Sequence, residues 1–166
     1  MKTLILITAF NVGNLITQVI KRIPQSIYNY EIEILIIDDF SSDDTLNKII
    51  EIKKNYRDIN INILSNKVNL GYGGNQKIGY HYAIKNNFDF VVLLHGDGQY
   101  APEKLESMLE PLSKGKGAVQ GSRMINKFDA LKGNMPIYKF IGNIFLTKIQ
   151  NFLTGMNLSE YHSGYR

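Results

Sequence analysis

The chain has 166 residues, contains no cysteine and carries a formal net charge of +4 at pH 7. A chain of this length can form one domain with a hydrophobic core, and the absence of cysteine excludes a disulfide framework and a zinc site built from thiolates. Because the basic excess is small and the lysines are scattered, we expect no nucleic acid partner, although an anionic ligand or a lipid headgroup surface is compatible with the charge.

The N-terminal residues do not resemble a targeting segment. Their apolar run is too short for a signal peptide and lacks a small-residue cleavage site. No apolar run along the chain approaches the ~20 residues that span a bilayer. Together with the lack of cysteine, these features lead us to expect a cytoplasmic location, at most in peripheral contact with the inner face of a membrane.

Short apolar runs alternate with segments of helical periodicity along the first part of the chain. We predict strands at residues 4–10, 32–37, 59–64, 88–94 and 118–121. Apolar stripes with helical spacing follow the first four, at residues 15–23, 46–52, 78–84 and 105–112. This alternation favours an α/β fold, with a Rossmann-like, mostly parallel sheet and helices on both faces.

Two of the predicted helices have start signals. Residues 42–45 place short polar acceptors where a helix would open, and these can accept hydrogen bonds from its first backbone donors. Pro102 and Glu103 suit a first helical turn, because proline needs no N–H there and a carboxylate suits the positive end of the helix.

The pattern changes after residue 121. Residues 122–136 are typical of a long loop, and residues 137–153 form a helix unusually rich in apolar side chains. That helix can pack against further C-terminal residues, or it can rest on a membrane surface or on the lipid tail of a ligand. No strand closes the pattern before Arg166, so we expect one domain over residues 1–166 that is truncated at its C-terminus.

Polar residues follow the fourth predicted strand at alternate positions. His95, Asp97 and Gln99 can converge at the carboxyl end of that strand, which is the edge where α/β sheets bind ligands. An oxygen-rich cluster there suits a hard divalent cation that also holds phosphates. The alternative is a polar turn in which Asp97 caps the following segment.

Two further segments follow predicted strands. Asp38 and Asp39 end the second strand, where a carboxylate can accept a hydrogen bond from a ribose or a base N–H, or can instead cap the next helix. Residues 69–75 contain three glycines in four positions and lead into a helix. Such a loop lets backbone N–H groups approach an anion, although it is not the dinucleotide fingerprint and can be purely structural.

The last candidate residues lie near the C-terminus. Arg123 can pair with a phosphate in a forked geometry, or it can be an ordinary surface arginine. Glu160 and His162 can position an acceptor or act as a base, unless their segment is frayed. His81, which lies in helical register, is expected to be structural or solvent-facing.

Taken in order, five of these motifs resemble the family 2 glycosyltransferases of the GT-A fold, and within them dolichol- or polyprenyl-phosphate mannose and glucose synthases. The motifs are residues 8–11, 36–45, 69–75, 95–100 and 121–123. The resemblance covers essentially the whole chain. It implies a GT-A fold and an inverting transferase that moves a sugar from a UDP- or GDP-sugar, with Mg or Mn, to polyprenyl phosphate or a cell-surface glycan precursor.

The resemblance also implies roles for particular residues. The nucleotide-sugar donor would be bound by Thr8, Phe10, Asn11, Asp38, Asp39, Asn69, Gly71, Gly74, Lys77 and Gly96. The metal would be held by His95, Asp97 and Gln99. Catalysis would involve Asp97, Arg123, Glu160 and His162. A lipid-phosphate acceptor is already anionic, so a strong general base is unnecessary.

This chain departs from the family pattern in places. The family usually has aspartate where His95 stands, and proline and glutamate where Thr8 and Val12 stand. His95 can ligate a metal through a ring nitrogen, which favours Mn over Mg, or it can leave the metal to Asp97, Gln99 and the diphosphate. Two alternative functions remain. One is a sugar nucleotidyltransferase, although residues 11–14 lack the glycine-rich basic loop that such an enzyme needs. The other is a non-catalytic module that binds sugar nucleotides.

Overall fold

The computed structural model describes residues 1–126 and 135–165 of the chain. These residues belong to two compact units, Met1–Val119 and Gln120–Tyr165. The first unit contains the sheet and most of the described helices, and the described residues of the second unit include one long helix. The single domain that we predict for residues 1–166 stays a prediction.

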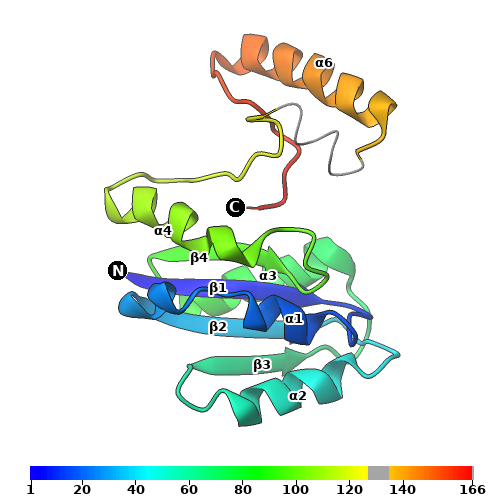
Figure 1. The fold of residues 1–166 in the computed structure, drawn as a ribbon, viewed down its shortest axis with the longest axis vertical. Helices are drawn as coiled ribbons and strands as arrows, with labels where there is room; N and C mark the ends of the chain where they lie inside the picture. Colours follow the sequence, from blue (N-terminus) through cyan, green and yellow to red (C-terminus); the bar gives the residue numbers. More distant parts are fainter. Residues whose placement is uncertain (127–134, 166) are drawn as a thin grey trace. The chain divides into compact units, whose positions relative to one another are not determined.

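The first unit is built on a four-stranded parallel sheet (Figure 1). The strands are β1 (Lys2–Ala9), β2 (Glu31–Asp38), β3 (Ile61–Ser65) and β4 (Phe90–His95), in the order β3-β2-β1-β4. Every neighbouring pair is parallel. The four strands predicted in this part of the chain are therefore confirmed, with ends shifted by a few residues.

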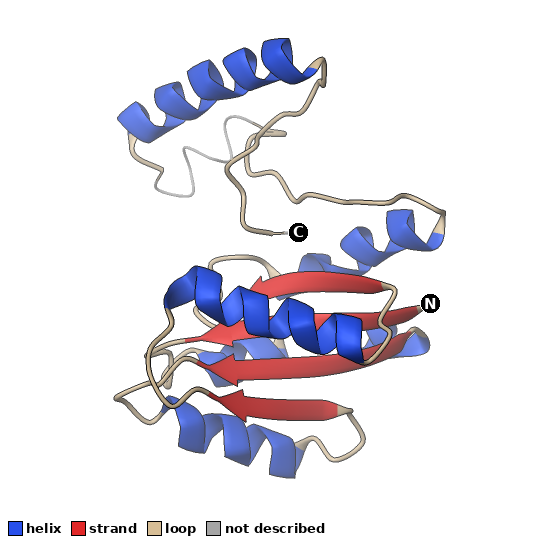
Figure 2. Cartoon of the chain, turned by 180° about the vertical axis from the view of Figure 1, so that it is seen from behind, coloured by secondary structure: helices blue, strands red, loops and turns tan. Residues whose placement is uncertain are grey.

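Helices cover both faces of this sheet, as predicted. The helical segments are α1 (Ile16–Lys21), η1 (Gln25–Asn29), α2 (Thr45–Asn55), α3 (Gly71–Lys85), η2 (Pro102–Lys104) and α4 (Leu105–Ser113). Figure 1 shows α1 and α2 in front of the strands, and Figure 2 shows α3 crossing the opposite face. The two predicted start signals lie where α2 and the η2–α4 segment begin.

The core lies on both faces of the two central strands. Residues 4–7 of β1 and 34–37 of β2 are fully buried, which requires cover on both sides because successive side chains of a strand alternate. On the α3 face, Leu6 and Leu35 pack with Ala83. A Cβ added to Gly79 would overlap the side chain of Leu6, so glycine allows α3 to approach the sheet closely.

The predicted fifth strand is wrong. Residues 118–121 are described and form no strand, so β4 is the edge of the sheet within the described residues. The segment is short, and Gly117 and Gly121 bound it, which disfavours strand structure. The backbone N–H of Gly121 donates to the carbonyl of Tyr165 at 2.8 Å instead. Residues 117–119 line a groove of about 290 Å³ beside β4.

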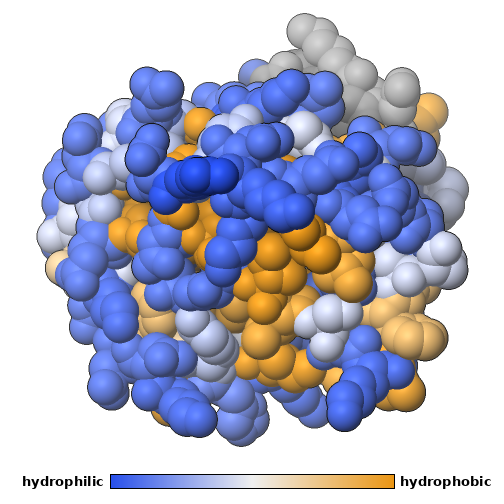
Figure 3. Space-filling view, turned by 90° about the horizontal axis from the view of Figure 1, so that it is seen from below, coloured by the Kyte–Doolittle hydropathy of each residue, from blue (hydrophilic) through white to orange (hydrophobic). Residues whose placement is uncertain are grey.

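The other edge of the sheet is β3. Ile63 and Leu64 are half-buried there, and Ile50 of the neighbouring α2 is 38% exposed. Figure 3, seen from below, shows an apolar area framed by polar residues on the side where β3 and α2 lie in Figure 1. This area follows from the position of β3 at the end of the sheet, where no further strand among the described residues covers its flank.

The second unit contains α6 (Ile137–Thr154), which confirms the helix predicted over residues 137–153. The helix ends at Gly155, whose φ of 67° is the left-handed conformation that commonly terminates helices.

Of the loop predicted at residues 122–136, residues 127–134 lie outside the described residues. Within the described part of the chain, no helix has the length and apolar character needed to cross a membrane.

Candidate functional site

The strand order creates a switch point between β1 and β4. The chain proceeds outward from β1 to β2 and β3, and then crosses back to place β4 on the other side of β1. In such sheets, ligands bind beyond the carboxyl ends of the strands at the point where the order reverses. The register pairs Thr8 with His95 and Ala9 with Asp38, so the polar residues that end three strands lie at one edge.

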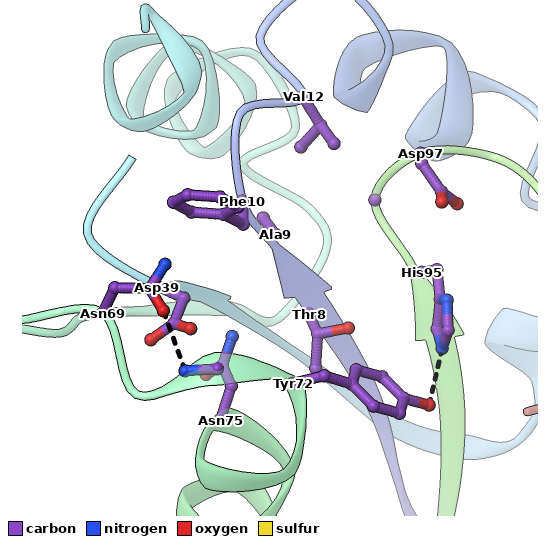
Figure 4. A pocket seen from close by; sticks show the side chains of 12 residues that line it. Thr8, Ala9, Phe10, Val12, Asp39, Asn69, Tyr72, Asn75, His95 and Asp97 are labelled. Atoms are coloured by element: carbon purple, nitrogen blue, oxygen red, sulfur yellow. Dashed lines mark hydrogen bonds between the residues drawn. The ribbon is translucent and has the colours of Figure 1, made fainter. Parts of the chain in front are cut away.

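A pocket of about 390 Å³ lies at this edge (Figure 4). Residues from four of the five motifs contribute to it. Its lining consists of Thr8, Ala9, Phe10, Val12, Asp39, Asn69, Gly71, Tyr72, Asn75, His95, Gly96 and Asp97. The structure thus brings together six of the predicted donor-binding residues and two of the three predicted metal ligands.

Asp39 is the central buried carboxylate of the pocket. It is 2% exposed, and its backbone N–H donates to the carbonyl of Ala9 at 2.9 Å. Its Oδ1 accepts hydrogen bonds from Asn66 Nδ2 at 2.7 Å and from the backbone N–H of Leu70 at 2.9 Å. Asp39 therefore ties the end of β1 to the loop before α3, and Oδ2 is the oxygen that it can offer to a ligand.

Asp38 does not line the pocket. Its Oδ2 accepts from Ser65 Oγ at 3.3 Å and from the backbone N–H of Ser41 at 3.4 Å, while its buried Oδ1 has no partner in the described structure. Of the adjacent carboxylates, only Asp39 borders the pocket, and Asp38 holds the loop after β2.

Asn11 also lies outside the pocket lining. Its backbone N–H donates to Ser41 Oγ at 3.0 Å, and its Oδ1 accepts from the backbone N–H of Ser42 at 2.9 Å. These bonds fasten the loop after β1 to the loop after β2. Asn11 and Phe40 both have positive φ, 52° and 61°, which is strained for residues other than glycine.

The glycine-rich segment, expected to be a loop, is mostly helical, because α3 begins at Gly71 and only Asn69 and Leu70 of the segment precede it. Asn69 Oδ1 accepts from the backbone N–H of Gly71 at 2.9 Å, and Gly71 has a φ of 71° that favours glycine. Gly74 faces Leu70 rather than the pocket, since an added Cβ would lie 2.7 Å from Leu70 Cβ. Lys77 is exposed and does not line the pocket. His81 Nδ1 lies 3.0 Å from the backbone carbonyl of Lys77, which agrees with a structural role for His81.

His95 is held between two aromatic rings. The ring centroid of His95 lies 5.0 Å from that of Tyr72 and 4.7 Å from that of Tyr100, both in edge-to-face geometry. Tyr72 Oη lies 2.8 Å from His95 Nε2, as Figure 4 shows. Burial lowers the pKa of His95, and the neighbouring Asp97 carboxylate opposes this shift only in part.

Sequence reasoning missed two polar members of the pocket. Tyr72 and Asn75 both lie at the start of α3, within the segment 69–75 from which only Asn69, Gly71 and Gly74 were predicted to bind the donor. Asn75 is 2% exposed, donates to the carbonyl of Ile37 at 3.1 Å, and has a buried Oδ1 without a partner in the described structure. The position of both residues inside the glycine-rich segment 69–75 is the signal that could have identified them.

The donor atoms near Asp97 suit a metal that is shared with a ligand. Asp97 is exposed, and its Oδ1 accepts from the backbone N–H of Gln99 at 2.9 Å. Gln99 is exposed and does not line the pocket. Among the described residues, no three His, Cys, Asp or Glu side chains are grouped to hold a metal. One carboxylate fits Mg²⁺ or Mn²⁺ only if substrate phosphates and water complete the coordination.

The second unit contains the other predicted catalytic residues. Glu160 is 1% exposed, and its carboxylate accepts from the backbone N–H of Arg123 at 2.8 Å, from Arg123 Nη2 at 2.6 Å and from Asn143 Nδ2 at 2.9 Å. Burial alone would raise the pKa of Glu160, but these hydrogen bonds outweigh it and lower the pKa. The exposed His162 contributes its carbonyl, 3.4 Å from Arg123 Nη2. Glu160 is therefore an anchor in this unit.

The parallel sheet and its polar pocket at the switch point define an α/β protein of the kind that binds nucleotides. The model of one family, Glycosyl transferase family 2, matches residues 4–166. The chain therefore belongs to that family, as the sequence motifs indicate.

Curated relatives agree with this assignment. The chain is 31% identical to UDP-N-acetylglucosamine--dolichyl-phosphate N-acetylglucosaminyltransferase of Methanococcus voltae, over 98% of this chain and 67% of that protein. It is 22% identical to polyprenol monophosphomannose synthase of Mycolicibacterium smegmatis, over 99% of this chain and 60% of that protein. The chain thus spans about two thirds of the length of these relatives.

Solved structures confirm the predicted GT-A fold. Mannosyltransferase PcManGT from Pyrobaculum calidifontis, in complex with GDP-Man and Mn²⁺, aligns with a TM-score of 0.53 and 14% identity over 64% of this chain and 30% of that one. S. aureus TarS 1–349 in complex with UDP-GlcNAc aligns with a TM-score of 0.55 and 19% identity over 76% and 38%. At these identities the likeness concerns the fold alone.

Proposed function

We propose that the chain is an inverting glycosyltransferase that moves a sugar from a UDP- or GDP-sugar to a lipid phosphate. Under this proposal Asp97 would hold a divalent metal, which would supply positive charge against the nucleotide diphosphate leaving group. Polyprenyl phosphate is the proposed acceptor, and a cell-surface glycan precursor is the other acceptor that fits the family. A lipid-phosphate acceptor would also bring the chain to a membrane surface, which is the peripheral contact that the sequence predicts.

One observation carries the proposal. Two carboxylates with different surroundings, the buried Asp39 and the exposed Asp97, lie on opposite sides of one pocket at the switch point. A buried, preorganised carboxylate suits recognition of a neutral ribose hydroxyl or base N–H, because it is already held by protein donors. An exposed carboxylate suits a hydrated cation that bridges to phosphates.

The residues of the chain can then be given tasks. Asp39 Oδ2 accepts a hydrogen bond from the nucleoside, and Phe10, which is 50% exposed, offers a ring beside it. Gly71 and Gly96 allow a ligand to approach the backbone. Asp97 holds the metal, which when bound supplies positive charge against the departing diphosphate. The anionic acceptor attacks the sugar C1 from the side opposite the diphosphate, which inverts the configuration there.

We also propose that the guanidinium of Arg123 binds a phosphate group. Its guanidinium is held by Glu160 through one nitrogen, Nη2, and its side chain is 37% exposed, so part of the fork remains accessible. Glu160 then positions Arg123 and does not itself take a proton. His162 stays a proposed acceptor-binding residue, since its side chain is exposed.

The names of similar proteins support the choice of substrates. Two relatives are named for dolichyl phosphate and polyprenol, and two solved structures are described with GDP-Man or UDP-GlcNAc. One of these structures also contains Mn²⁺. Because the chain spans only part of each of these proteins, the activity, the substrates and the acceptor remain proposals for this chain.

A non-catalytic module that binds sugar nucleotides is the second candidate. The observation that favours it is His95, which stands where the family usually has a metal-binding aspartate and is engaged with Tyr72. A sugar nucleotidyltransferase gains no support, because residues 11–14 form a loop fastened to Ser41, Ser42 and Asp43 rather than a basic triphosphate loop.

Calorimetry with UDP, GDP, UDP-glucose and GDP-mannose, with and without Mn²⁺, tests the proposal. We expect one nucleotide series to bind and Mn²⁺ to strengthen binding. Asp97→Asn should remove the effect of Mn²⁺, and Asp39→Asn should weaken nucleotide binding roughly tenfold or more in both conditions, since it removes a charged acceptor. Asp58→Asn, an exposed aspartate outside the pocket, is the control.

Two outcomes would contradict the proposal. If no nucleotide binds to the folded chain, the donor site is not functional. If Asp97→Asn retains the full effect of Mn²⁺, the metal assignment is wrong. Binding without sugar transfer to polyprenyl phosphate would favour the non-catalytic module.

A further inference from the structure

The helix α6 has its polar side packed inward and its apolar side exposed. The two buried residues of this helix are Asn143 and Thr147. In contrast, Phe145 is 63% exposed, Phe152 is 87% exposed and Leu153 is 74% exposed. Helices of globular proteins normally have the opposite arrangement, with the apolar stripe toward the core.

Hydrogen bonds hold this orientation in place. Asn143 donates to the buried Glu160 carboxylate at 2.9 Å and accepts from Thr147 Oγ1 at 3.1 Å. One turn further on, Asn151 donates to the carbonyl of Leu158 at 2.9 Å and accepts from the backbone N–H of Leu158 at 2.9 Å. Rotating the helix to bury its apolar side would break these bonds and leave the Glu160 carboxylate with fewer donors, which is costly for a buried charge.

The exposed side chains form one continuous face. Ile137, Ile141, Phe145 and Ile149 follow each other at intervals of four residues, and Phe152 continues the stripe three residues later. At 3.6 residues per turn, these positions lie on one side of the helix. All five are between 40% and 87% exposed. An apolar stripe of this length on a water-exposed surface indicates an interaction site.

The charge of this part of the chain indicates what the face contacts. Residues 120–166 contain six of the 19 basic residues and two of the 15 acidic ones, so they carry the whole net charge of +4, while residues 1–119 are balanced. The helix itself contains Lys139 and Lys148 and no acidic residue. A helix with an exposed apolar face in a basic segment fits a surface that is both apolar and anionic.

We propose that the apolar face of α6 docks onto anionic lipid membranes, with the helix lying in the plane of the interface. Its apolar side chains would enter the boundary between headgroups and acyl chains, and Lys139 and Lys148 would remain near the lipid phosphates. The inference deepens the membrane contact of the proposed function. It makes no use of the donor pocket, so the two can fail separately.

Tryptophan fluorescence provides a direct test, because the chain contains no tryptophan. Phe152→Trp places a single reporter on the apolar face, and Ile84→Trp places one at a 75% exposed position on α3 as a matched control. With vesicles of phosphatidylcholine and phosphatidylglycerol, the emission of the Phe152→Trp variant should shift to the blue and resist aqueous quenchers. The emission of the Ile84→Trp variant should not change.

Vesicle sedimentation measures the strength of docking. The unmodified chain should sediment with vesicles that contain phosphatidylglycerol, more weakly with phosphatidylcholine alone, and less at high salt. The double variant Phe145→Ser/Phe152→Ser should bind vesicles at least roughly tenfold more weakly than the unmodified chain. Ile84→Ser should bind as the unmodified chain does. Circular dichroism and nucleotide calorimetry on the same variants check that the fold and the donor site are intact.

The proposal is overturned if the folded chain does not sediment with either kind of vesicle. It is also overturned if the double variant binds as strongly as the unmodified chain. If the apolar face instead pairs with a second copy, light scattering will show a dimer that the double variant converts to a monomer, with no vesicle binding. That result also excludes membrane docking.

Discussion

Glu160 illustrates how burial decides the role of a single residue. Its carboxylate lies close to a histidine and an arginine in the sequence, which suggests a base. In the structure the carboxylate is enclosed and accepts three hydrogen bonds from Arg123 and Asn143. A carboxylate whose charged form is stabilised by donors is a poor base and a strong anchor.

The anchoring role predicts an acid-dependent loss of stability. The pKa of Glu160 is lowered in the folded state, so the charged form contributes stability above the unfolded value near 4.5, and this contribution is lost as the pH falls through the lower folded value. At pH 7, Glu160→Gln should lower the free energy of unfolding by about 2 kcal/mol, the typical loss of hydrogen bonds to a buried charge.

Urea unfolding at pH 7 and at pH 3 measures both effects. The difference between Glu160→Gln and the unmodified chain should shrink at the lower pH, because the carboxyl of the unmodified chain is then becoming protonated. A difference that is equal at both pH values would show that the charge of Glu160 does not matter. Glu106→Gln, an exposed glutamate, serves as the control.

At the same scale, the sequence predicted the strand-end residues of the pocket and missed two polar residues of α3, Tyr72 and Asn75. Asp39 and His95 were identifiable because parallel strands place their carboxyl ends at one edge. Asn75 was not, because nothing in a helical pattern indicates which turn faces a ligand. Asn11 shows the reverse case: it follows β1 as predicted, yet its side chain binds Ser42 instead of lining the pocket.

Among the elements, α3 connects the pocket to the core. Its first two turns carry Tyr72 and Asn75 into the pocket, and further along Gly79 lies against Leu6 in β1. The close approach of helix and strand at Gly79 therefore fixes the distance of the pocket residues from the sheet. Since Leu6 is fully buried, it has no free space into which it can move.

This contact predicts that Gly79→Ala destabilises the chain. The added methyl group must displace Leu6, and overpacking of this kind costs about 1–3 kcal/mol. Gly73→Ala in the same helix is the matched control, because an added Cβ there meets no atom within 4 Å. Alanine should be neutral or stabilising at that position by up to about 1 kcal/mol, since it has the higher helix propensity.

Thermal and urea unfolding of the two variants give the comparison. If Gly79→Ala is as stable as the unmodified chain, α3 can move away from the sheet, and its approach does not fix the pocket. In that case nucleotide binding to Gly79→Ala should be measured to see whether the pocket has changed.

The elements also show where sequence patterns are sufficient. The four strands β1 to β4 are predicted because each is an apolar run between turn residues, and the central strands β1 and β2 are buried by helices on both faces. Residues 118–121 have a weaker version of the same pattern, and local glycines and the bond from Gly121 to Tyr165 decide against a strand. The length of α6 follows from its apolar pattern, but the direction of its apolar side does not, because that depends on distant partners such as Glu160.

For the whole molecule, the division of charge matches the division of tasks that we propose. Residues 1–119 are electrically balanced and contain the pocket, while residues 120–166 carry the net positive charge and the apolar face of α6. Neither feature follows from total composition, since a net charge of +4 spread evenly over the chain would indicate no particular surface. The charge has to be located along the chain before it points to a partner.

The pocket as a whole predicts that metal and nucleotide stabilise the chain together. One carboxylate, Asp97, is a weak site for Mn²⁺ alone, and a diphosphate alone would face Asp97 without a cation between them. Bound together, each supplies what the other lacks, so the rise in melting temperature with both should exceed the sum of the separate rises. A ligand present at 100 times its dissociation constant adds about 2.7 kcal/mol to the free energy of unfolding.

Melting curves with Mn²⁺, with UDP or GDP, with both, and with both plus EDTA measure this coupling. The chelator should return the curve to that of nucleotide alone. In Asp97→Asn, the rises in melting temperature from the two ligands should be additive, while Asp58→Asn should leave the coupling unchanged. If Mn²⁺ alone stabilises the chain as much as the mixture does, the metal site is complete without phosphate, and a second protein ligand must be sought. His95 would be the first candidate, because its Nε2 lies within reach of the pocket once the bond to Tyr72 is released.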